Sequence, residues 1–420
     1  MLVSILIFLI GLAVYAGYGL WGFAYLAAAV LVSYGCGLLT KKYPFMAFVS
    51  IALNAAMLVL VKLQPVTGLH LISVMGISYF TLQIISYNAD VYRGKYEAER
   101  NLFRYALYVT YLPHLFLGPI DRYDTMRRAL VEDRRITLDG VLEGAARAVW
   151  GGFKKLVIAS RLAVITGAIS AAPDKYRGAY ALAAMLFYAV QLYADFSGGM
   201  DMVLGISRML GVRLSENFDT PYFSRSIQEF WRRWHITLGG WLREYVYIPL
   251  GGNRKGKVRK VVNLLITFLV SGLWHGVEYL FWGLFHGIFV ALGKRMQTKW
   301  RLVDQILTFL IVSLLWSFFV WPDAWTSLKM IGSVFTTFNY GAFFTQVGEL
   351  GLKLSDWLVL AGSLAVLWAA DWKKNAVSSR FRAAAPWVRL SVAGVLGIAV
   401  LLLGMYGIGF AAESFIYSRF

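Results

Sequence analysis

The feature that most constrains this chain is a series of apolar runs, most of them long enough to cross a bilayer. Short segments that carry most of the lysines and arginines separate these runs. A helix of about 20 apolar residues spans the hydrocarbon core of a membrane. Because lipid offers the backbone no hydrogen-bonding partner, spanning segments of this kind fold as helices. The sequence therefore predicts an all-α polytopic membrane protein.

The composition supports this class. Of the 420 residues, 59% are hydrophobic and 15% are charged, whereas a soluble domain has about 25% charged residues. The formal net charge of +18 would suit nucleic acid, but the basic residues lie between apolar runs, as expected where Lys and Arg stay on the cytoplasmic face. No nucleic-acid partner is expected. A single cysteine, Cys36, excludes an intramolecular disulfide and a multi-cysteine metal site, and no metal is expected.

The chain is expected to form one domain, residues 1–420, with its core at 70–295. Two short spans should meet near Gly19, Pro65 should lie in an outside turn, and the apolar run that contains Pro113 and Pro119 should form a re-entrant pair of short helices. The expected total is about eleven crossings around a central tunnel. The spans are predicted at 45–63, 69–91, 141–169, 180–204, 303–321, 357–370 and 388–405, with a hairpin from 264 that turns near 276–279, a loop at 322–354 and a basic loop at 373–382.

A basic, aromatic-rich segment at 205–260 contains no clean crossing. Its composition is typical of amphipathic helices that lie at the cytoplasmic interface. The arginines, among them Arg232, Arg233 and Arg243, have two interpretations. They orient the protein in the membrane, or they bind an anionic partner such as the phosphates of coenzyme A or phosphopantetheine, which suit the arginine fork.

Two of the five histidines, His235 and His275, are each preceded by a tryptophan, Trp234 and Trp274. His275 lies in a glycine-flanked WHG turn, where glycine permits close backbone approach. Its apolar setting disfavours the imidazolium, which leaves a neutral ring that can accept a proton near pH 7. The arginines beside His235 also disfavour its charged form. We expect the two histidines to face one reaction chamber.

The remaining histidines have weaker interpretations. His114 lies in the re-entrant segment and is expected to line the same cavity. His286 is interpreted as a helix-packing residue, and His70 as a solvated residue at a membrane boundary. In the segment QLYADFSGGMD, Asp195 is interpreted as a buried structural residue paired with an arginine or a helix N-terminus, or as a functional residue, and Asp201 as a solvated residue near the cytoplasmic end.

Several motifs together resemble the membrane-bound O-acyltransferase family. They are FWRRWHITLGGWLREYVYIPLGGNRKG, SGLWHG, QLYADFSGGMDM, GISYFTLQIISYNADVYRG and YLPHLFLGPIDRY. The resemblance covers most of the chain from about residue 30. IPLGGNRKG and the closing FIYSRF are most similar to the bacterial alginate and exopolysaccharide O-acetylation branch, whereas GPIDRY also resembles the teichoic-acid D-alanylation branch.

The resemblance implies that His275 is the catalytic histidine and His235 the second active-site histidine. It also implies a thioester donor, acetyl-CoA or an acyl-phosphopantetheine carrier, that reaches the tunnel from the cytoplasm. The acyl group would pass to a hydroxyl on the outer side, often on a secreted or membrane-anchored partner, in a bacterial inner membrane. No resident cofactor is implied. The residues expected to line the donor path are Trp274, Trp234, Asn217, Arg232, Arg233, Arg243, Tyr193, Asp195 and His114.

Other functions stay open from the residues. One is D-alanyl transfer to teichoic acid through a carrier protein. A second is a transporter with an intramembrane His and Asp proton relay, which would show repeat symmetry and paired broken helices; the sequence has no such repeat. A third is a non-catalytic scaffold subunit of an acylation complex. Acetyl transfer to a cell-surface or secreted polysaccharide is the favoured prediction.

Overall fold

The structure is a computed structural model that describes residues 2–68, 74–132, 134–293 and 297–406. Every named element in these ranges is a helix, and the one β-interaction among them is an isolated bridge between Phe218 and Trp234. The predicted all-α class is confirmed. His70 and the closing FIYSRF lie outside the described residues.

Six of the described helices are long and apolar enough to cross a membrane. Shorter apolar helices lie at Val3–Gly17 and Val277–Leu292, and the total of about eleven crossings stays a prediction. The six are α2 (Leu20–Leu39), α3 (Phe45–Thr67), α10 (Ala179–Met209), the consecutive α15 and α16 (Arg301–Val320), α19 (Leu354–Trp372) and α21 (Pro386–Leu403).

The other elements are short or carry more charge. In chain order they are α1 (Leu2–Tyr18), α4 (Ile77–Tyr92), α5 (Leu102–Val109), α6 (Leu112–Leu117), α7 (Tyr123–Arg127), η1 (Arg128–Glu132), α8 (Leu138–Phe153), η2 (Lys154–Ala159), α9 (Ser160–Ala171), η3 (Pro221–Phe223), α11 (Ile227–Arg233), α12 (Ile236–Leu242), η4 (Arg243–Tyr247), α13 (Gly256–His275), η5 (Val277–Tyr279), α14 (Leu280–Leu292), α17 (Ala324–Thr336), α18 (Tyr340–Gln346), η7 (Val347–Leu350) and α20 (Lys374–Ala383).

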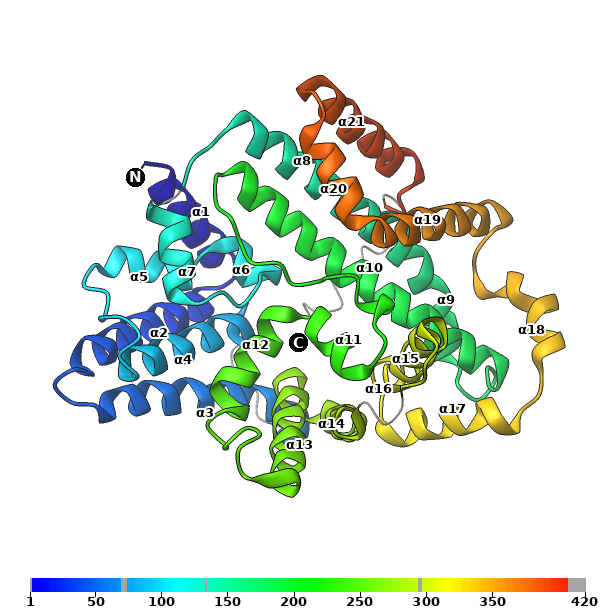
Figure 1. Cartoon of the computed structure of the whole chain (residues 1–420), viewed down its shortest axis with the longest axis horizontal. Helices are drawn as coiled ribbons and strands as arrows, with labels where there is room; N and C mark the ends of the chain where they lie inside the picture. The colour runs from blue at the N-terminus through cyan, green and yellow to red at the C-terminus, as the bar shows by residue number, and fades with distance from the viewer. Residues whose placement is uncertain (1, 69–73, 133, 294–296, 407–420) are drawn as a thin grey trace.

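The N-terminal helices α1 to α7 form one side of the molecule, and α10 crosses the centre (Figure 1). The predicted turn near Gly19 separates α1 from α2, and the predicted re-entrant run forms the two short helices α5 and α6. The turn predicted at Pro65 is wrong, because α3 continues to Thr67. Pro65 removes one helical donor, but the last turn still closes through Gly68 N–H, which donates to Gln64 O at 3.0 Å.

Glycines bring α8 and α10 together. A Cβ atom on Gly151 would lie 2.4 Å from the carbonyl oxygen of Gly198, and one on Gly144 would lie 2.5 Å from that of Gly205. Small residues let the backbones of membrane helices approach closely. Gly144 faces Gly205 and Gly151 faces Gly198, so the residue numbers rise along α8 while they fall along α10. The two helices therefore run antiparallel.

Buried charges join α10 to α8 and to η2, the turn that continues α8. Asp195 is paired with Lys155, which agrees with a buried structural role but with a lysine as partner. The prediction of a solvated Asp201 is wrong. Its carboxylate lies 2.8 Å from Arg147 and 2.6 Å from Lys154, and its side chain is only 16% exposed. Carboxylates inside a membrane protein are costly unless they are paired, and these cations supply the pairing.

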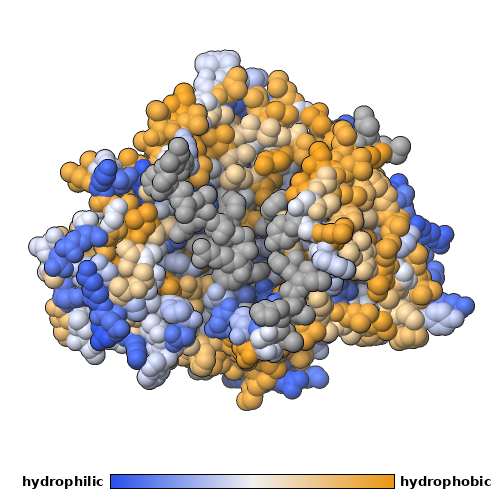
Figure 2. Space-filling model, turned by 180° about the vertical axis from the view of Figure 1, so that it is seen from behind, coloured by the Kyte–Doolittle hydropathy of each residue, from blue (hydrophilic) through white to orange (hydrophobic). Residues whose placement is uncertain are grey.

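The C-terminal part is more helical than predicted. The loop expected at 322–354 contains α17 and α18, and the basic loop expected at 373–382 contains α20. Asp323 begins α17, because its side chain accepts a hydrogen bond from Thr326 N–H at 2.8 Å. Figure 2 shows the opposite face of the molecule, on which apolar residues cover wide areas and hydrophilic residues gather at the edges. A surface of this kind suits lipid contact.

Candidate active site

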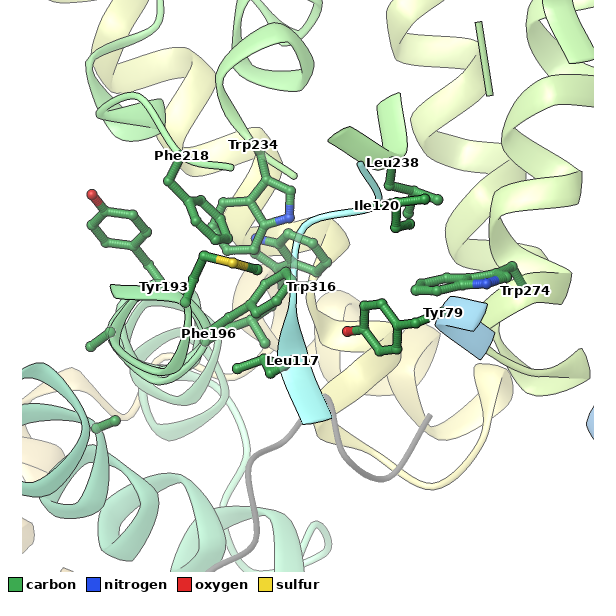
Figure 3. Close-up of a cluster of buried hydrophobic side chains, with 14 of the residues drawn as sticks. Tyr79, Leu117, Ile120, Tyr193, Phe196, Phe218, Trp234, Leu238, Trp274 and Trp316 are labelled. Atoms are coloured by element: carbon green, nitrogen blue, oxygen red, sulfur yellow. The ribbon is translucent and has the colours of Figure 1, made fainter. Parts of the chain in front are cut away.

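His235 and His275 both pack against the ring of Trp274 near the centre of the molecule. The Trp274 ring centroid lies 4.7 Å from that of His275 and 6.0 Å from that of His235. Both histidines are buried. Trp274 is fixed by its indole N–H, which donates to Ser78 O of α4 at 3.0 Å, and by an edge contact with Tyr79 (Figure 3). The prediction that both histidines belong to one chamber is therefore consistent with this geometry.

His235 has an unusual backbone. It precedes α12 with φ 46° and ψ 52°, the left-handed region, which residues other than glycine rarely adopt. Ile236 N–H donates to Asn217 O at 3.0 Å and so ties this turn to the extended segment before α11. Backbone strain of this kind is held only where the surrounding structure enforces it, often at functional sites.

Asn217 sets the orientation of the His235 ring. Its Oδ1 accepts from Thr237 N–H at 3.0 Å and from the Thr237 hydroxyl at 2.9 Å. His235 Nδ1 lies 3.2 Å from Asn217 Nδ2 and 3.3 Å from Asn217 Oδ1. Because Oδ1 already accepts two hydrogen bonds from Thr237, we assign Nδ2 as the donor to the ring. A neutral ring that accepts at Nδ1 carries its proton on Nε2. This arrangement makes His235 a hydrogen-bond donor.

His235 lies on the short segment between α11 and α12, which is not a membrane-spanning helix. Burial lowers its pKa to about 3, because desolvation disfavours the charged imidazolium. The ring is therefore neutral at physiological pH. The prediction named the neighbouring arginines as the cause, but burial alone accounts for the shift.

A third histidine, His286, belongs to the wall of the centre. Its Nδ1 accepts from the indole N–H of Trp231 at 3.2 Å, and the side chain is fully buried. Trp282 connects the two sites, because its ring centroid lies 5.3 Å from His275 and 5.1 Å from His286. The interpretation of His286 as a packing residue agrees with these contacts.

Aromatic rings surround the three histidines and exclude water. Rings from segments far apart in the sequence share one core, among them Phe196 of α10, Trp274 of α13 and Trp316 between α15 and α16 (Figure 3). Trp282 and Trp316 are stacked at 5.7 Å, and Trp234 lies 5.2 Å from Trp316. Polar groups act more strongly in such a site, because the effective dielectric constant is low.

A cavity of about 440 Å³ lies between residues of α7, α12 and η4, and Thr237, two residues after His235, is part of its wall. Thr237 links the cavity to the histidine, because its hydroxyl bonds to Asn217 and also accepts from Ile120 N–H at 2.9 Å. The cavity is lined by Ile120, Asp121, Arg122, Thr125, Ser215, Thr237, Gly240, Arg243, Glu244 and Ile248.

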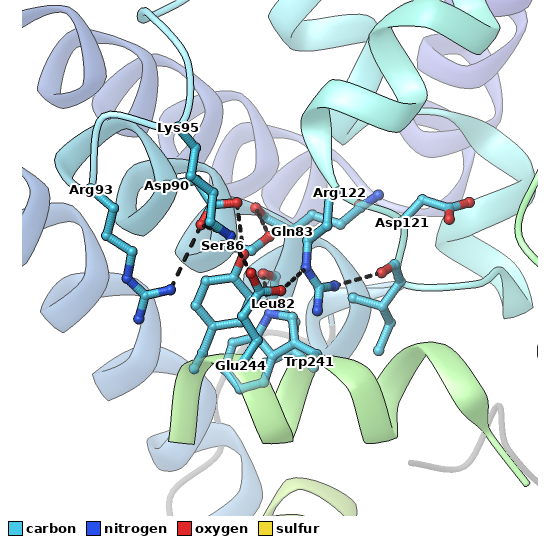
Figure 4. A network of polar contacts seen from close by, with 12 residues as sticks. Leu82, Gln83, Ser86, Asp90, Arg93, Lys95, Asp121, Arg122, Trp241 and Glu244 are labelled. Carbon is cyan, nitrogen blue, oxygen red and sulfur yellow. Dashed lines mark hydrogen bonds and ion pairs between the residues drawn. The ribbon is translucent and has the colours of Figure 1, made fainter. Parts of the chain in front are cut away.

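Charges at the mouth of this cavity are mostly paired (Figure 4). Glu244 bonds to Arg122 at 3.2 Å and to Lys95, which also lies 2.9 Å from Asp90. Burial alone would raise the pKa of Glu244, but hydrogen bonding from Lys95 and the charge of Arg122 hold it below its ordinary value. Arg243 differs, since no carboxylate of the described residues lies within 4 Å of its guanidinium. It is therefore the cation in this wall best placed for an external anion.

Some predicted residues do not reach the centre. Arg232 is exposed, and Arg233 is bound by Glu229 at 2.6 Å. Neither lines the cavity. Asp195 is likewise engaged, by its pair with Lys155. Tyr193 contributes its ring to the aromatic core, 6.1 Å from Trp234, and its hydroxyl donates to Asp371 at 2.7 Å.

His114 approaches the cavity through a neighbour. It is fully buried, with Nδ1 3.0 Å from Gln83 Nε2 and Nε2 3.6 Å from Asp121. Asp121 lines the cavity and His114 does not. The sequence analysis also missed Thr237, which joins cavity and histidine. Its position two residues after His235 was the only available signal.

Comparisons with known proteins place the chain in a family. The sequence model of MBOAT, the membrane-bound O-acyltransferase family, matches residues 98–337. This chain belongs to the membrane-bound O-acyltransferase family, as the motifs predicted, and its apolar helices make it a multi-pass membrane protein.

The chain is similar to proteins named for the acylation of alginate, peptidoglycan and teichoic acid. A probable alginate O-acetylase of Pseudomonas syringae pv. tomato is 40% identical over 77% of this chain and 64% of its own length. A peptidoglycan O-acetyltransferase of Helicobacter pylori is 33% identical over 63% of this chain and 57% of its length. A teichoic acid D-alanyltransferase of Streptococcus thermophilus is 30% identical over 59% and 64%. The chain thus spans about two thirds or less of the length of these relatives.

Proposed function

We propose that this chain is a membrane O-acyltransferase that moves an acetyl group from a cytoplasmic thioester donor to a hydroxyl on the outer side of the membrane. The modified product is a cell-surface or secreted polysaccharide. The observation that carries the proposal is the pair of buried histidines around Trp274, one of them joined to the cavity through Asn217 and Thr237.

His275 acts as the general base. Its imidazole takes the proton of the acceptor hydroxyl while that oxygen attacks the thioester carbonyl carbon. The tetrahedral oxyanion then collapses, the C–S bond breaks, and the thiolate takes the proton back from His275. A positioned base of this type contributes about 10²–10⁴ in rate. The aromatic wall limits attack by water on the donor.

His235 stabilises the oxyanion by donating a hydrogen bond to it. Its neutral ring, held by Asn217, presents Nε2–H as a fixed donor in surroundings of low dielectric constant. Donors that are oriented before the reaction stabilise a developing oxyanion without reorganisation, and the loss of one such donor costs roughly 10²–10³ in rate.

The donor approaches through the cavity of about 440 Å³. Acetyl-CoA and an acyl-phosphopantetheine carrier share a phosphate followed by a flexible thiol arm. Arg243 suits the phosphate, and the arm reaches inward past Thr237. In this proposal the cavity opens to the cytoplasmic side of the bacterial inner membrane, in keeping with the basic segments that flank the spans. A secreted or membrane-anchored partner outside receives the acyl group for the polymer.

Mass spectrometry of surface polymers from cells with and without the gene tests the activity. We expect an O-acetyl ester that disappears with the gene and returns with the wild-type chain. If a D-alanyl ester is lost instead, the transferred group is D-alanyl and its donor a D-alanyl carrier. The Streptococcus thermophilus relative is named for this D-alanyl transfer. Unchanged ester content would contradict both.

Purified protein tests the donor directly. The full chain in lipid nanodiscs is incubated with labelled acetyl-CoA, and release of free thiol is measured. We expect release that depends on His275, with a His275→Ala variant that is inserted normally and is inactive. Equal release from the His275→Ala variant would contradict the proposed base.

A further inference from the structure

A buried carboxylate lies in the wall of the cavity, and the proposed transfer chemistry does not use it. Asp121, in the GPIDRY segment between α6 and α7, is 3% exposed and lines the cavity of about 440 Å³. Arg243 lines the same cavity and is exposed. The cavity therefore extends from the protein surface at Arg243 to a buried acidic group at Asp121.

The protein holds this carboxylate in one orientation. Asp121 Oδ2 accepts from Ser215 N–H at 3.3 Å and lies 3.6 Å from His114 Nε2. The His114 ring is fixed in turn, because its Nδ1 lies 3.0 Å from Gln83 Nε2. The main-chain carbonyl oxygen of Asp121 accepts from the Tyr108 hydroxyl at 3.2 Å. The side chain is thus oriented before a ligand binds.

The charge of Asp121 is not neutralised by a neighbouring lysine or arginine. Among the described residues, none of these cations forms an ion pair with it, and the adjacent Arg122 is bound by Glu244 at 3.2 Å. Figure 4 shows the Asp121 carboxylate pointing away from that pair. An ionised carboxylate only accepts hydrogen bonds, and it offers about four lone-pair sites, more than Ser215 and His114 fill. Since a buried charge is costly unless it is satisfied, a ligand that completes this site brings an N–H or O–H group.

The thioester donors of the proposed reaction carry such groups. Acetyl-CoA and an acyl-phosphopantetheine carrier share an arm with secondary amides between the phosphate and the sulfur. With the phosphate at Arg243 and the thioester beyond Thr237, this arm follows the wall that contains Asp121. Hydrogen bonds to an ionised acceptor are roughly twice as strong as those between neutral groups. An amide N–H is therefore a suitable partner for the carboxylate.

We propose that Asp121 is a donor-specificity residue, whose carboxylate accepts an amide N–H of the donor arm and so aligns the thioester with the central histidines. His114 and the Ser215 N–H are positioning groups that act through this carboxylate. The inference rests on the proposed acyl transfer and adds recognition of the arm between phosphate and sulfur. Asp121 takes no part in proton transfer.

The test changes one atom of the donor. Thiol release by the full chain in lipid nanodiscs is measured with S-acetylpantetheine and with analogues in which one amide N–H at a time is replaced by an ester oxygen. D-alanyl thioesters are used if the polymer analysis requires them. With the wild-type chain, at least one analogue should have a kcat/KM lower by about tenfold or more, because an ester oxygen leaves the carboxylate unpaired.

Asp121→Asn should reduce this preference to about twofold or less, because a side-chain amide donates as well as accepts hydrogen bonds. The maximal rate with the ester analogue should stay close to that of the wild type. Asp124→Asn is the matched control, since Asp124 is exposed and lies outside the cavity wall, and it should keep the full preference. His114→Gln should raise KM for S-acetylpantetheine and leave kcat nearly unchanged, because His114 only positions the carboxylate.

Two natural sources of the arm are compared in parallel. Acetyl-CoA and an acetylated phosphopantetheine carrier are titrated against the wild-type chain, and the source of the arm is the donor with the lower half-saturating concentration. Asp121→Asn should raise that concentration for this donor, and Asp124→Asn should not.

Three results would overturn the inference: equal reactivity of the amide and ester donors with the wild-type chain, a wild-type preference retained in Asp121→Asn, or loss of rate by one common factor with every donor in that variant. The last would make Asp121 a support for Asn217 through Ser215. The wild-type comparison needs no variant, so it decides even where Asp121→Asn does not fold. If the proposed function itself fails, the wild-type chain releases no thiol from any donor. Elution as a single peak on size exclusion confirms that each variant is folded.

Discussion

The buried centre and the C-terminal helices are built from similar apolar sequence, yet they are held in place in different ways. In α10, 72% of the most apolar window is buried inside the protein, against 6% in α21. The centre is secured by aromatic packing around three histidines. The C-terminal helices, which face outward, are fixed by a few polar contacts.

Those contacts lie near the ends of the outer helices. Arg389 of α21 is 5% exposed and bonds to Asp139 of α8 at 2.5 Å. Arg161 of α9 lies 3.3 Å from Asp356 of α19 and donates to Leu403 O at 2.6 Å. Because lipid tails are as apolar as the helix surface, burial of apolar area gives such a helix little preference for one position. Directional polar bonds supply that preference.

The largest effect is expected when two of the central histidines are replaced one at a time, which tests whether they have different roles. His275→Gln, which keeps most of the side-chain volume, should lower acyl transfer by about 10²–10⁴ with little change in thermal stability. His286→Ala should lower the melting temperature and keep a larger share of activity, since that ring packs against Trp282 and bonds to Trp231. Thiol release and a thermal shift assay measure the two effects. Equal loss of activity in both variants would contradict the separate roles.

The second prediction concerns the antiparallel pair that supports the centre. Gly151→Ala should destabilise the protein by about 1–3 kcal/mol, because the new methyl group would meet Gly198 O at 2.4 Å. The adjacent Gly152→Ala is the control, with no atom within 4 Å of its Cβ position, and it should be neutral or stabilising. Thermal unfolding in detergent compares them. Equal melting temperatures would refute the close approach of α8 and α10.

The third prediction tests whether the acyl donor reaches the central histidines through the cavity. Arg243→Met should raise the half-saturating donor concentration about tenfold, equivalent to about 1.4 kcal/mol, because the guanidinium lines the cavity without an acidic partner in the described part of the chain. Arg232→Met is the matched control on the exposed face. Donor titrations of thiol release measure both variants. An equal effect from Arg232→Met would mean that Arg243 has no specific role in donor binding and that these arginines only orient the protein in the membrane.

The smallest effect is expected at the periphery. Arg389→Met should cost about 1 kcal/mol of stability, because Asp139 is 70% exposed and water can take over its solvation once the bond is lost. The acyl-transfer rate per folded molecule should stay unchanged. Arg380→Met, on α20, should show no shift in the same thermal assay. Loss of activity in the folded Arg389→Met variant would tie the outer helices to the chemistry of the centre.

Much of the fold followed from simple patterns. The apolar runs predicted the helices, Gly19 predicted the first break, and the two prolines of 102–119 predicted short helices in place of a full span. The loop predicted at 322–354 failed, because α17 and α18 are short and depend on a local cap at Asp323. Hydropathy detects spans and does not detect short helices that lie between them.

The candidate site was partly visible in the sequence. His235 and His275 stood out through their repeated Trp–His context, and the structure brings both against Trp274. The arginines were not distinguishable by sequence, since Arg232 and Arg243 occur in one basic segment and only Arg243 lines the cavity.

The amino-acid sequence was enough to predict an all-α membrane protein of the O-acyltransferase family, and it singled out His235 and His275 as candidate site residues. Apolar length and motif chemistry are local properties, and they need no knowledge of neighbours. Only the packed structure shows that Asp201 is paired and that Thr237 joins the cavity wall to His235 through Asn217. Each of these depends on which helices pack together, and packing is set by close contacts between segments that lie far apart in the chain.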